Sequence, residues 1–128
     1  NTDEPVESEA EFALTDEGLA GLAEVGGTAL LVAGPVEILL VRDAEDSVLG
    51  FDRRCPHAQL DMAPVDGNAL PAVWDKEART LKCQWHASVF GDDGDFVEGP
   101  PGVADLKRYE VTFDAANGTG VVQILPTA

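Results

Sequence analysis

The sequence predicts an all-β protein, built as an antiparallel β-sandwich or barrel with almost no helix. Short apolar segments rich in β-branched residues recur along the chain, and each is long enough for one strand. Glycine, proline and aspartate interrupt these segments at close intervals, as they do in tight turns. Several neighbouring segments are separated by a single turn, so they can pair directly as hairpins.

The first half of the chain is expected to form a meander. A strand is expected to begin at Phe12, and residues 16–22 suit a helical turn that ends at the glycines 26–27. Residues 34–35, a glycine and a proline, and the polar residues 43–47 suit turns between strands. The strands of this meander are expected at residues 28–33, 36–42 and 48–52.

The second half of the chain is expected to form three hairpins. Each consists of two apolar segments on either side of a short turn that contains aspartate or glycine. The paired segments are residues 72–74 with 80–82, residues 89–90 with 96–97, and residues 107–113 with 121–125.

Length and composition favour one compact domain. The chain has 128 residues, of which 45% are hydrophobic, and a domain of this size buries roughly two-thirds of its unfolded surface. Five acidic residues and a proline precede the first expected strand. We therefore expect residues 1–11 to be a flexible acidic segment and residues 12–128 to be a single folded domain.

The charge of the chain makes two kinds of partner unfavourable. With 24 acidic and 8 basic residues the net charge is −16, which repels nucleic acid and anionic lipid. The same charge suits a solvated, salt-tolerant surface or steering toward a basic partner. No apolar run approaches the roughly 20 residues of a membrane helix, so no membrane insertion is expected. The chain begins with asparagine, which fits an exported protein whose leader was removed. A cytoplasmic location is the alternative expectation.

The only two cysteines and the only two histidines form two matched pairs. One residue separates Cys55 from His57, and two residues separate Cys83 from His86. Two thiolates and two imidazoles are a complete ligand set for tetrahedral zinc or for a [2Fe–2S] cluster. Shared metal ligation explains this spacing better than a disulfide does, because each cysteine has a histidine beside it in an expected loop.

The residues around these pairs resemble a Rieske [2Fe–2S] protein of the ferredoxin type. The matching motifs are C-P-H-A-Q-L at 55–60, C-Q-W-H-A-S-V-F at 83–90, G-P-P at 99–101 and L-K-R-Y-E-V at 106–111. The resemblance implies a Rieske-type fold whose small cluster-binding subdomain, built from two hairpin loops, covers about residues 53–101. It also implies one [2Fe–2S] cluster per chain, with Cys55 and Cys83 on the inner iron and His57 and His86 on the outer iron.

Further side chains are expected beside the cluster, namely Gln59, Leu60, Trp85, Ser88, Phe90 and Pro100. By motif position Ser88 would donate a hydrogen bond to a bridging sulfide, whereas Phe90 replaces a tyrosine that donates to a cysteine sulfur in high-potential relatives. Trp85 suits shielding or docking, and Pro100 belongs to the expected proline loop. One donor instead of two predicts a reduction potential in the lower or middle part of the Rieske range of roughly −150 to +300 mV.

The chain departs from the family pattern in three respects. The 25 residues at 58–82 are more than small Rieske ferredoxins commonly have between the two motifs. We expect an insertion at about 66–76 and interpret it as an enlarged surface loop rather than a docking element. Ala87 stands where the family often has glycine, which restricts the backbone of the second loop. The extra cysteine that each loop carries in the cytochrome bc type is absent.

These features predict a one-electron transfer protein that is not itself an enzyme. No histidine is left for general-base catalysis once both bind metal, and no phosphate-binding glycine loop occurs. The expected partners are redox proteins, such as a reductase, an oxygenase or a cytochrome. One alternative is a Rieske small subunit of a respiratory-type or molybdenum oxidoreductase. An alternative of another class is a structural zinc-binding module that mediates protein interactions.

Overall fold

The computed structural model describes residues 9–33, 36–55, 60–63, 71–84, 87–99 and 104–124. These residues form three antiparallel sheets, and the helical element among them is a single short 3-10 helix, η1 (Ala20–Ala23). The prediction of an all-β fold is therefore confirmed. Within the described ranges, no helix has the length and the apolar character that crossing a bilayer requires.

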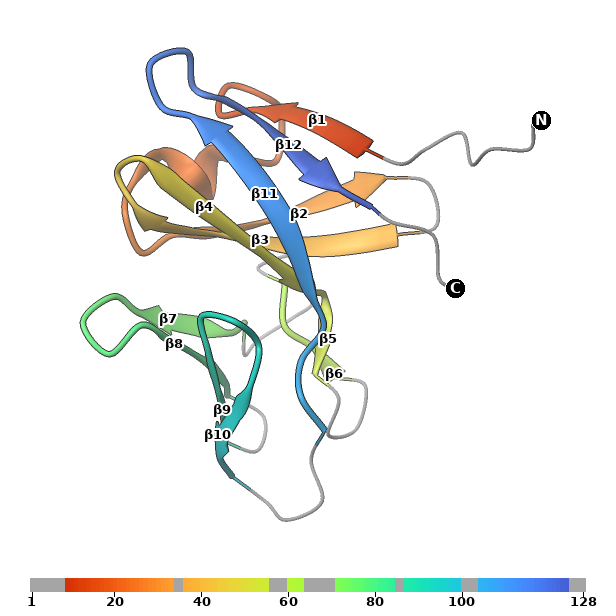
Figure 1. Ribbon diagram of the computed structural model, residues 1–128, viewed down its shortest axis with the longest axis vertical. Helices are drawn as coiled ribbons and strands as arrows, with labels where there is room; N and C mark the ends of the chain where they lie inside the picture. The colour runs from red at the N-terminus through yellow and green to blue at the C-terminus, as the bar shows by residue number, and fades with distance from the viewer. Residues whose placement is uncertain are drawn as a thin grey trace, which may run out of the picture.

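The largest sheet has six strands and forms the upper part of Figure 1. Across this sheet the strands follow in the order β1 (Glu9–Ala13), β12 (Thr119–Gln123), β11 (Arg108–Asp114), β4 (Ser47–Asp52), β3 (Val36–Ala44) and β2 (Thr28–Ala33). The first and last strands of the chain, β1 and β12, are neighbours, with Glu9 opposite Gln123 and Ala13 opposite Thr119. The two ends of the described chain are thus joined in one sheet.

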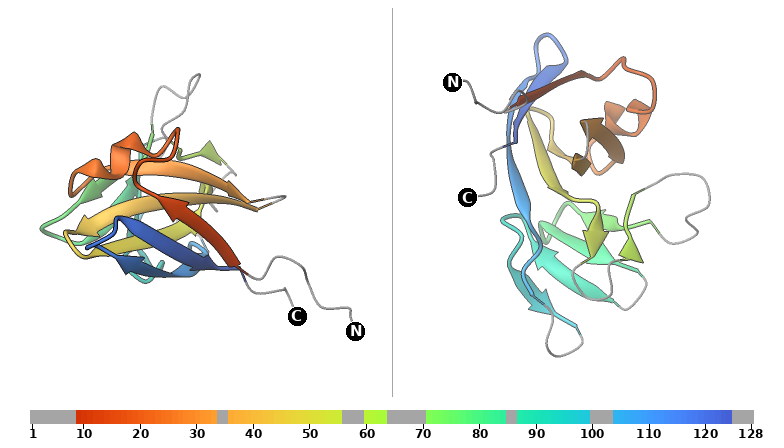
Figure 2. Two further views of the ribbon diagram at one scale, coloured as in Figure 1. Left: turned by 90° about the horizontal axis from the view of Figure 1, so that it is seen from above. Right: turned by 90° about the vertical axis from the view of Figure 1, so that its right-hand side faces the viewer.

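Two smaller sheets lie together at the opposite end of the molecule (Figures 1 and 2). The four-stranded sheet has the order β10 (Phe96–Glu98), β9 (Ser88–Gly91), β8 (Thr80–Cys83) and β7 (Val73–Asp75). The two-stranded sheet consists of β5 (Arg54–Cys55) and β6 (Leu60–Asp61). The small sheets contain both cysteines, so this end of the molecule carries the candidate metal centre.

Strands β3 and β4 of the six-stranded sheet separate two hydrophobic cores. Successive residues of a strand face opposite sides, so Ile38 and Leu40 enter one core while Leu39 and Val41 enter the other. The core that contains Leu39 also contains residues from and beside the small sheets, namely Met62, Ala63, Trp74, Leu81, Cys83 and Phe90. The small sheets are therefore packed against one face of the large sheet.

An arginine fastens the four-stranded sheet to the six-stranded sheet. Arg79 ends the turn between β7 and β8, and its Nη2 donates to Oδ2 of Asp43 on β3 at 2.8 Å. Its Nε donates to Oδ2 of Asp92 at 3.0 Å, and its guanidinium carbon lies 5.8 Å from the centre of the Trp74 ring. The side chain of Asp43 is only 2% exposed. Arg79 thus supplies the cation that a buried carboxylate needs.

Most of the predicted strands are confirmed, including the meander of β2, β3 and β4 and all three hairpins. The start of the first strand was placed too late. Strand β1 begins at Glu9 rather than Phe12, so residues 9–11, expected to be flexible, pair with β12. Glu9 and Glu11 are exposed whereas Ala10 and Phe12 face the core, so the segment alternates as a surface strand does.

Three further elements differ from the sequence-based expectation. The helical turn expected at 16–22 is the short helix η1 at Ala20–Ala23. Strands β5 and β6 were not predicted, because two residues are too few to show a periodic pattern. Of the expected insertion at 66–76, residues 66–70 lie outside the described residues, and residues 71–76 include β7. Trp74 in β7 is buried.

Replacing Arg79 with methionine should lower the free energy of unfolding by about 2 kcal/mol, because the buried Asp43 carboxylate would lose its cation. Chemical denaturation of the two proteins measures this difference. Lys76→Met is the matched control, since Lys76 is exposed in the same turn. Equal losses in both variants would contradict the role assigned to Arg79.

Candidate metal centre

The two cysteines occupy equivalent positions in the two smaller sheets. Cys55 is the last residue of β5 and pairs with Leu60 of β6. Cys83 is the last residue of β8 and pairs with Ser88 of β9. Each cysteine is therefore followed by a four-residue connection between paired strands, and each connection contains one of the two histidines of the chain.

Several predicted site residues lie outside the described residues, namely His57, Gln59, Trp85, His86 and Pro100. Cys55 and Leu60 are described for their backbone alone, whereas Cys83, Ser88 and Phe90 are described with their side chains. The described part of the chain, which does not include the histidines, shows no group of three or more histidine, cysteine or carboxylate side chains suited to a metal ion. The structure therefore tests the surroundings of the second cysteine most directly.

The hairpin of β8 and β9 turns one face toward the core. Leu81 and Phe90 pair across this hairpin, and both side chains are fully buried. Cys83 and Ser88 pair two residues further along the ladder and are likewise 0% exposed. Lys82, which precedes Cys83, is exposed on the opposite face. The alternation of the strands thus places a thiol and a hydroxyl opposite each other on the buried face.

The hydroxyl of Ser88 has no hydrogen-bond partner among the described residues, although it is fully buried. Leaving a buried hydroxyl unsatisfied costs on the order of 1–3 kcal/mol. Gly99 approaches it closely, since a Cβ atom on Gly99 would lie 2.9 Å from Cα and 3.2 Å from Oγ of Ser88. With a φ of 145°, residue 99 also has a conformation that favours glycine. The second hairpin therefore holds a buried hydroxyl that has no acceptor among the described residues.

Ala87 precedes Ser88 and adopts a left-handed backbone conformation, with a φ of 61°. This conformation costs a residue with a Cβ atom about 1 kcal/mol relative to glycine. The finding agrees with the expectation that alanine is a constrained residue at this position. The second connection thus ends in a sharp reversal that directs the chain from the expected ligand region back into β9.

Phe90 lies behind Ser88 on the same buried face and offers no hydroxyl. Its ring contacts Phe96 of β10 edge to face, with ring centres 6.0 Å apart and planes inclined by 65°. This arrangement is typical of a stable aromatic pair. On the described inner face of this hairpin, one side-chain hydroxyl, that of Ser88, is thus available to the candidate centre.

An ion pair lies at the base of the first connection. Arg53 Nε and Nη2 donate to the two carboxylate oxygens of Asp61, each at 2.9 Å. This hydrogen bonding lowers the pKa of Asp61 against the opposing effect of burial, and the backbone N–H of Ala63 lowers it further. Asp61 in turn raises the pKa of Arg53. Sequence reasoning did not single out this pair, whose only signal is one charged residue on either side of the first motif.

Other acidic residues of the small sheets serve the turns. Oδ1 of Asp75 accepts hydrogen bonds from the backbone N–H groups of Glu77 and Ala78, both at 3.0 Å. Asp93 accepts one from the N–H of Asp95, which lowers the pKa of Asp93, whereas the charge of Asp93 raises the pKa of Asp95. These contacts give the carboxylates of Asp75 and Asp93 a structural role in the turns.

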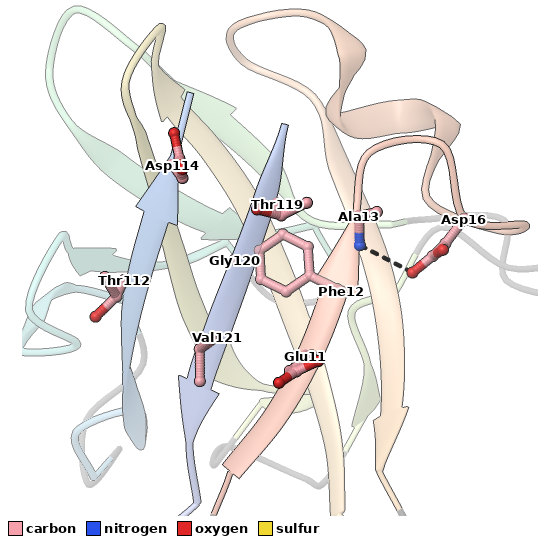
Figure 3. A pocket seen from close by; sticks show the side chains of 9 residues that line it. All are labelled: Glu11, Phe12, Ala13, Asp16, Thr112, Asp114, Thr119, Gly120 and Val121. Atoms are coloured by element: carbon pink, nitrogen blue, oxygen red, sulfur yellow. Dashed lines mark hydrogen bonds between the residues drawn. The ribbon is translucent and has the colours of Figure 1, made fainter. Parts of the chain in front are cut away.

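A surface depression of about 610 Å³ lies elsewhere, on the edge of the six-stranded sheet formed by β1, β12 and β11 (Figure 3). Its lining includes Glu11, Asp16 and Asp114, and Asp16 Oδ2 accepts a hydrogen bond from the N–H of Ala13 at 2.9 Å. The lining contains no thiol and no imidazole. This depression is therefore separate from the candidate metal centre.

The family comparison and the structural comparison both find Rieske-type or ferredoxin proteins. The family model described as "Rieske [2Fe-2S] domain" matches residues 16–110. The ferredoxin of carbazole 1,9a-dioxygenase from Nocardioides aromaticivorans is similar in structure, with a TM-score of 0.62, 23% identity, and coverage of 80% of this chain and 88% of that chain. The plasma membrane Rieske protein of Synechocystis PCC 6803 gives a TM-score of 0.50 with 17% identity, covering 77% of this chain and 96% of that chain. No curated protein matches the chain in sequence.

The described residues fit a [2Fe–2S] cluster. Sulfur from cysteine is the usual ligand of such a cluster, and Cys83 presents its side chain on a buried face at the end of a strand. An inorganic sulfide would give the hydroxyl of Ser88 the acceptor that the described residues do not provide. The donor set and the one unsatisfied hydroxyl of this face thus point to the same kind of group.

Ala87→Gly should raise the free energy of unfolding by about 0.5 kcal/mol, because relief of the left-handed conformation outweighs the entropy that glycine adds to the unfolded chain. Ala78→Gly is the control. Ala78 is exposed in a turn and has no positive φ, so its replacement should lower stability. Denaturation should therefore separate the two variants by about 1 kcal/mol, and an equal effect at both sites would exclude strain at Ala87.

Proposed function

Because the chain belongs to the Rieske [2Fe–2S] domain family, we propose that it is a small carrier that exchanges single electrons with a redox enzyme. The family has one [2Fe–2S] cluster per domain, so this chain binds one cluster. Its general function is iron–sulfur electron transfer rather than catalysis. The bound cluster supplies a centre that accepts and releases one electron.

Four side chains hold the cluster in this proposal. Cys55 and Cys83 bind the inner iron through sulfur, and His57 and His86 bind the outer iron through a ring nitrogen. The symmetry of the two cysteine positions supports this assignment, since each cysteine ends a strand and each four-residue connection carries one histidine. Two strand ends that each carry a cysteine are a suitable frame for four ligands.

The buried hydroxyl of Ser88 is the observation that carries the proposal. It lies opposite Cys83 on the inner face of the hairpin and has no acceptor among the described residues. A donor aimed at the cluster stabilises the additional negative charge of the reduced state, so it raises the reduction potential. Phe90 supplies no second donor, which favours a potential in the lower or middle part of the Rieske range.

An oxygenase, or the reductase that serves one, is the proposed partner. The structural neighbour with the higher TM-score is described as the ferredoxin of a dioxygenase, and this chain covers 88% of its length. The plasma membrane Rieske protein gives a lower TM-score, so a subunit role in a respiratory-type or molybdenum oxidoreductase is the second candidate. A structural zinc module is not retained, because the family cofactor is an iron–sulfur cluster.

The ligand proposal is tested by the composition and spectrum of natively matured protein. We expect equal amounts of iron and acid-labile sulfide, a reddish-brown colour and a rhombic electron paramagnetic resonance signal after reduction. His86→Cys should lower the midpoint potential by on the order of 100 mV or more, because replacing imidazole by thiolate adds negative charge to the centre. A colourless protein with one zinc, or an unchanged spectrum and potential in His86→Cys, would reject the proposal.

Ser88→Ala should lower the midpoint potential by about 60 mV, which corresponds to a tenfold change in a one-electron equilibrium. The expected cause is the loss of a hydrogen bond that is stronger in the reduced state. Ser47→Ala is the control, because Ser47 begins β4 in the six-stranded sheet. Protein-film voltammetry of the three proteins measures the shift, and the same potential in Ser88→Ala and wild type would show that this hydroxyl does not contact the cluster.

A further inference from the structure

We propose that Arg53 and Asp61 form a positioning clamp that holds the first ligand-bearing connection in its binding geometry. The proposal rests on the assignment of Cys55 and His57 as cluster ligands. Neither member of the clamp is a ligand in that assignment. Their role is to fix the two strands from which the connection between Cys55 and Leu60 begins and ends.

The clamp spans the base of the connection. Arg53 immediately precedes β5, and Asp61 is the last residue of β6. The two hydrogen bonds between the guanidinium and the carboxylate are parallel and both 2.9 Å long. A bidentate pair of this kind restricts orientation as well as distance. It therefore limits both the separation and the rotation of the two strands.

Arg53 is also fixed to the six-stranded sheet. Its backbone N–H donates to the carbonyl of Glu37 on β3 at 3.2 Å, and its Nη1 lies 3.3 Å from Oε2 of the same residue. The side chain of Arg53 is only 18% exposed. An arginine that is partly shielded from water and held by two carboxylates is a rigid anchor, unlike an exposed surface ion pair. Through Glu37 the first connection is thus anchored to strand β3 of the six-stranded sheet.

Asp61 fixes the other end of the connection. Its Oδ1 accepts a hydrogen bond from the N–H of Ala63 at 2.8 Å, and the N–H of Met62 donates to the carbonyl of Arg53 at 2.9 Å. Met62 and Ala63 are fully buried in the core that also contains Cys83. The clamp therefore joins the end of the first connection to the core that contains the second cysteine, Cys83.

The first connection needs this support more than the second does. The ladder of β5 and β6 has two register pairs, whereas that of β8 and β9 has four and continues into β7 and β10. An isolated two-stranded ladder is only marginally stable in water, and a ladder with two register pairs is less stable still. The side-chain clamp compensates for the short ladder, so that two unequal hairpins present their cysteines with similar rigidity.

The test compares three variants, each in the natively matured, cluster-loaded full chain. Arg53→Lys keeps the charge but cannot form the bidentate pair. Arg54→Gln removes a positive charge next to Cys55 while leaving the clamp intact, since Arg54 is half exposed and lies 3.5 Å from Glu37. Arg79→Lys weakens an arginine contact of the same subdomain at the turn remote from both connections. Together the three variants distinguish an effect of the clamp geometry from an effect of local charge and from a general loss of stability.

Arg53→Lys should lose its cluster to an iron chelator about tenfold faster than wild type, as removal of an outer-sphere partner typically does. Hydrogen exchange of the segment with Met62 and Ala63 should accelerate, and the rhombic electron paramagnetic resonance signal should broaden. Arg54→Gln and Arg79→Lys should keep the wild-type chelation rate and signal. Asp61→Asn should behave as Arg53→Lys does, and the double variant should be no faster than either single variant.

Two results would overturn the clamp while leaving the proposed function intact. One is a wild-type chelation rate and signal in Arg53→Lys. The other is a loss of cluster in Arg79→Lys equal to that in Arg53→Lys at the same loss of thermal stability, because the effect would then be general destabilisation. A wild-type chain that matures without any iron–sulfur cluster would instead reject the ligand assignment itself, so the two failures are distinguishable.

Discussion

The candidate centre depends on one geometric constraint, which is that each cysteine must be the last residue of a strand whose partner strand resumes after four residues. Cys55 opposite Leu60 and Cys83 opposite Ser88 satisfy it. A strand end fixes the direction of a side chain more precisely than the middle of a loop does. Each four-residue connection contains one histidine in its sequence. The four potential ligands thus come from only two short segments of the chain, residues 55–57 and 83–86.

The constraint is met in different ways on the two sides. Cys83 belongs to a continuous four-stranded sheet, and its side chain is fixed by burial among Leu81, Phe90 and the core residues beyond. Cys55 belongs to a two-residue strand, so backbone pairing contributes little there. Ion pairs and hydrogen bonds around Arg53 and Asp61 take over that role. The two connections are therefore equal in length but begin from strands that are stabilised in different ways.

The parts of the fold that follow from periodicity could be predicted from the sequence. Strands β2 to β4 and the three hairpins have alternating or continuous apolar patterns, and the structure confirms them. The burial of Ser88 and Phe90 on one face also follows from alternation in a hairpin. Strands β5 and β6 could not be predicted, because their pairing depends on closure of the ligand connection rather than on a pattern of their own.

Long-range contacts between charged residues were equally inaccessible to sequence reasoning. Arg79 and Asp43 are 36 residues apart in the chain, and both lie in segments whose composition suggests an ordinary solvated turn. Only the packing of the four-stranded sheet against β3 brings them together. The same holds for Arg53 and Glu37, which meet because β5 leaves the large sheet next to β3. Charged residues that appear similar in sequence thus differ sharply in structural importance.

The net charge of −16 is distributed unevenly along the chain. All eight lysines and arginines lie between Arg42 and Arg108, so β1, β2 and β12 contain no basic residue, and β1 carries Glu9 and Glu11. In Figure 1, β1 and β12 lie at the end opposite the small sheets. Charges more than about 10 Å apart in solvent are largely screened at moderate salt. The distant acid therefore has little effect on the potential of the centre, and neighbours such as Arg53, Arg54 and Asp61 have more.

This asymmetry also bears on how a partner is recognised. A strongly basic partner would be attracted first to the acidic end of the six-stranded sheet, which is the end remote from both cysteines. The proposed electron transfer requires contact at the end that carries the cysteines, where basic and acidic side chains are mixed. Long-range attraction alone therefore does not produce the correct orientation. Contacts made at close range by the small sheets, where Val73 and Val97 are exposed, must decide which partners dock productively.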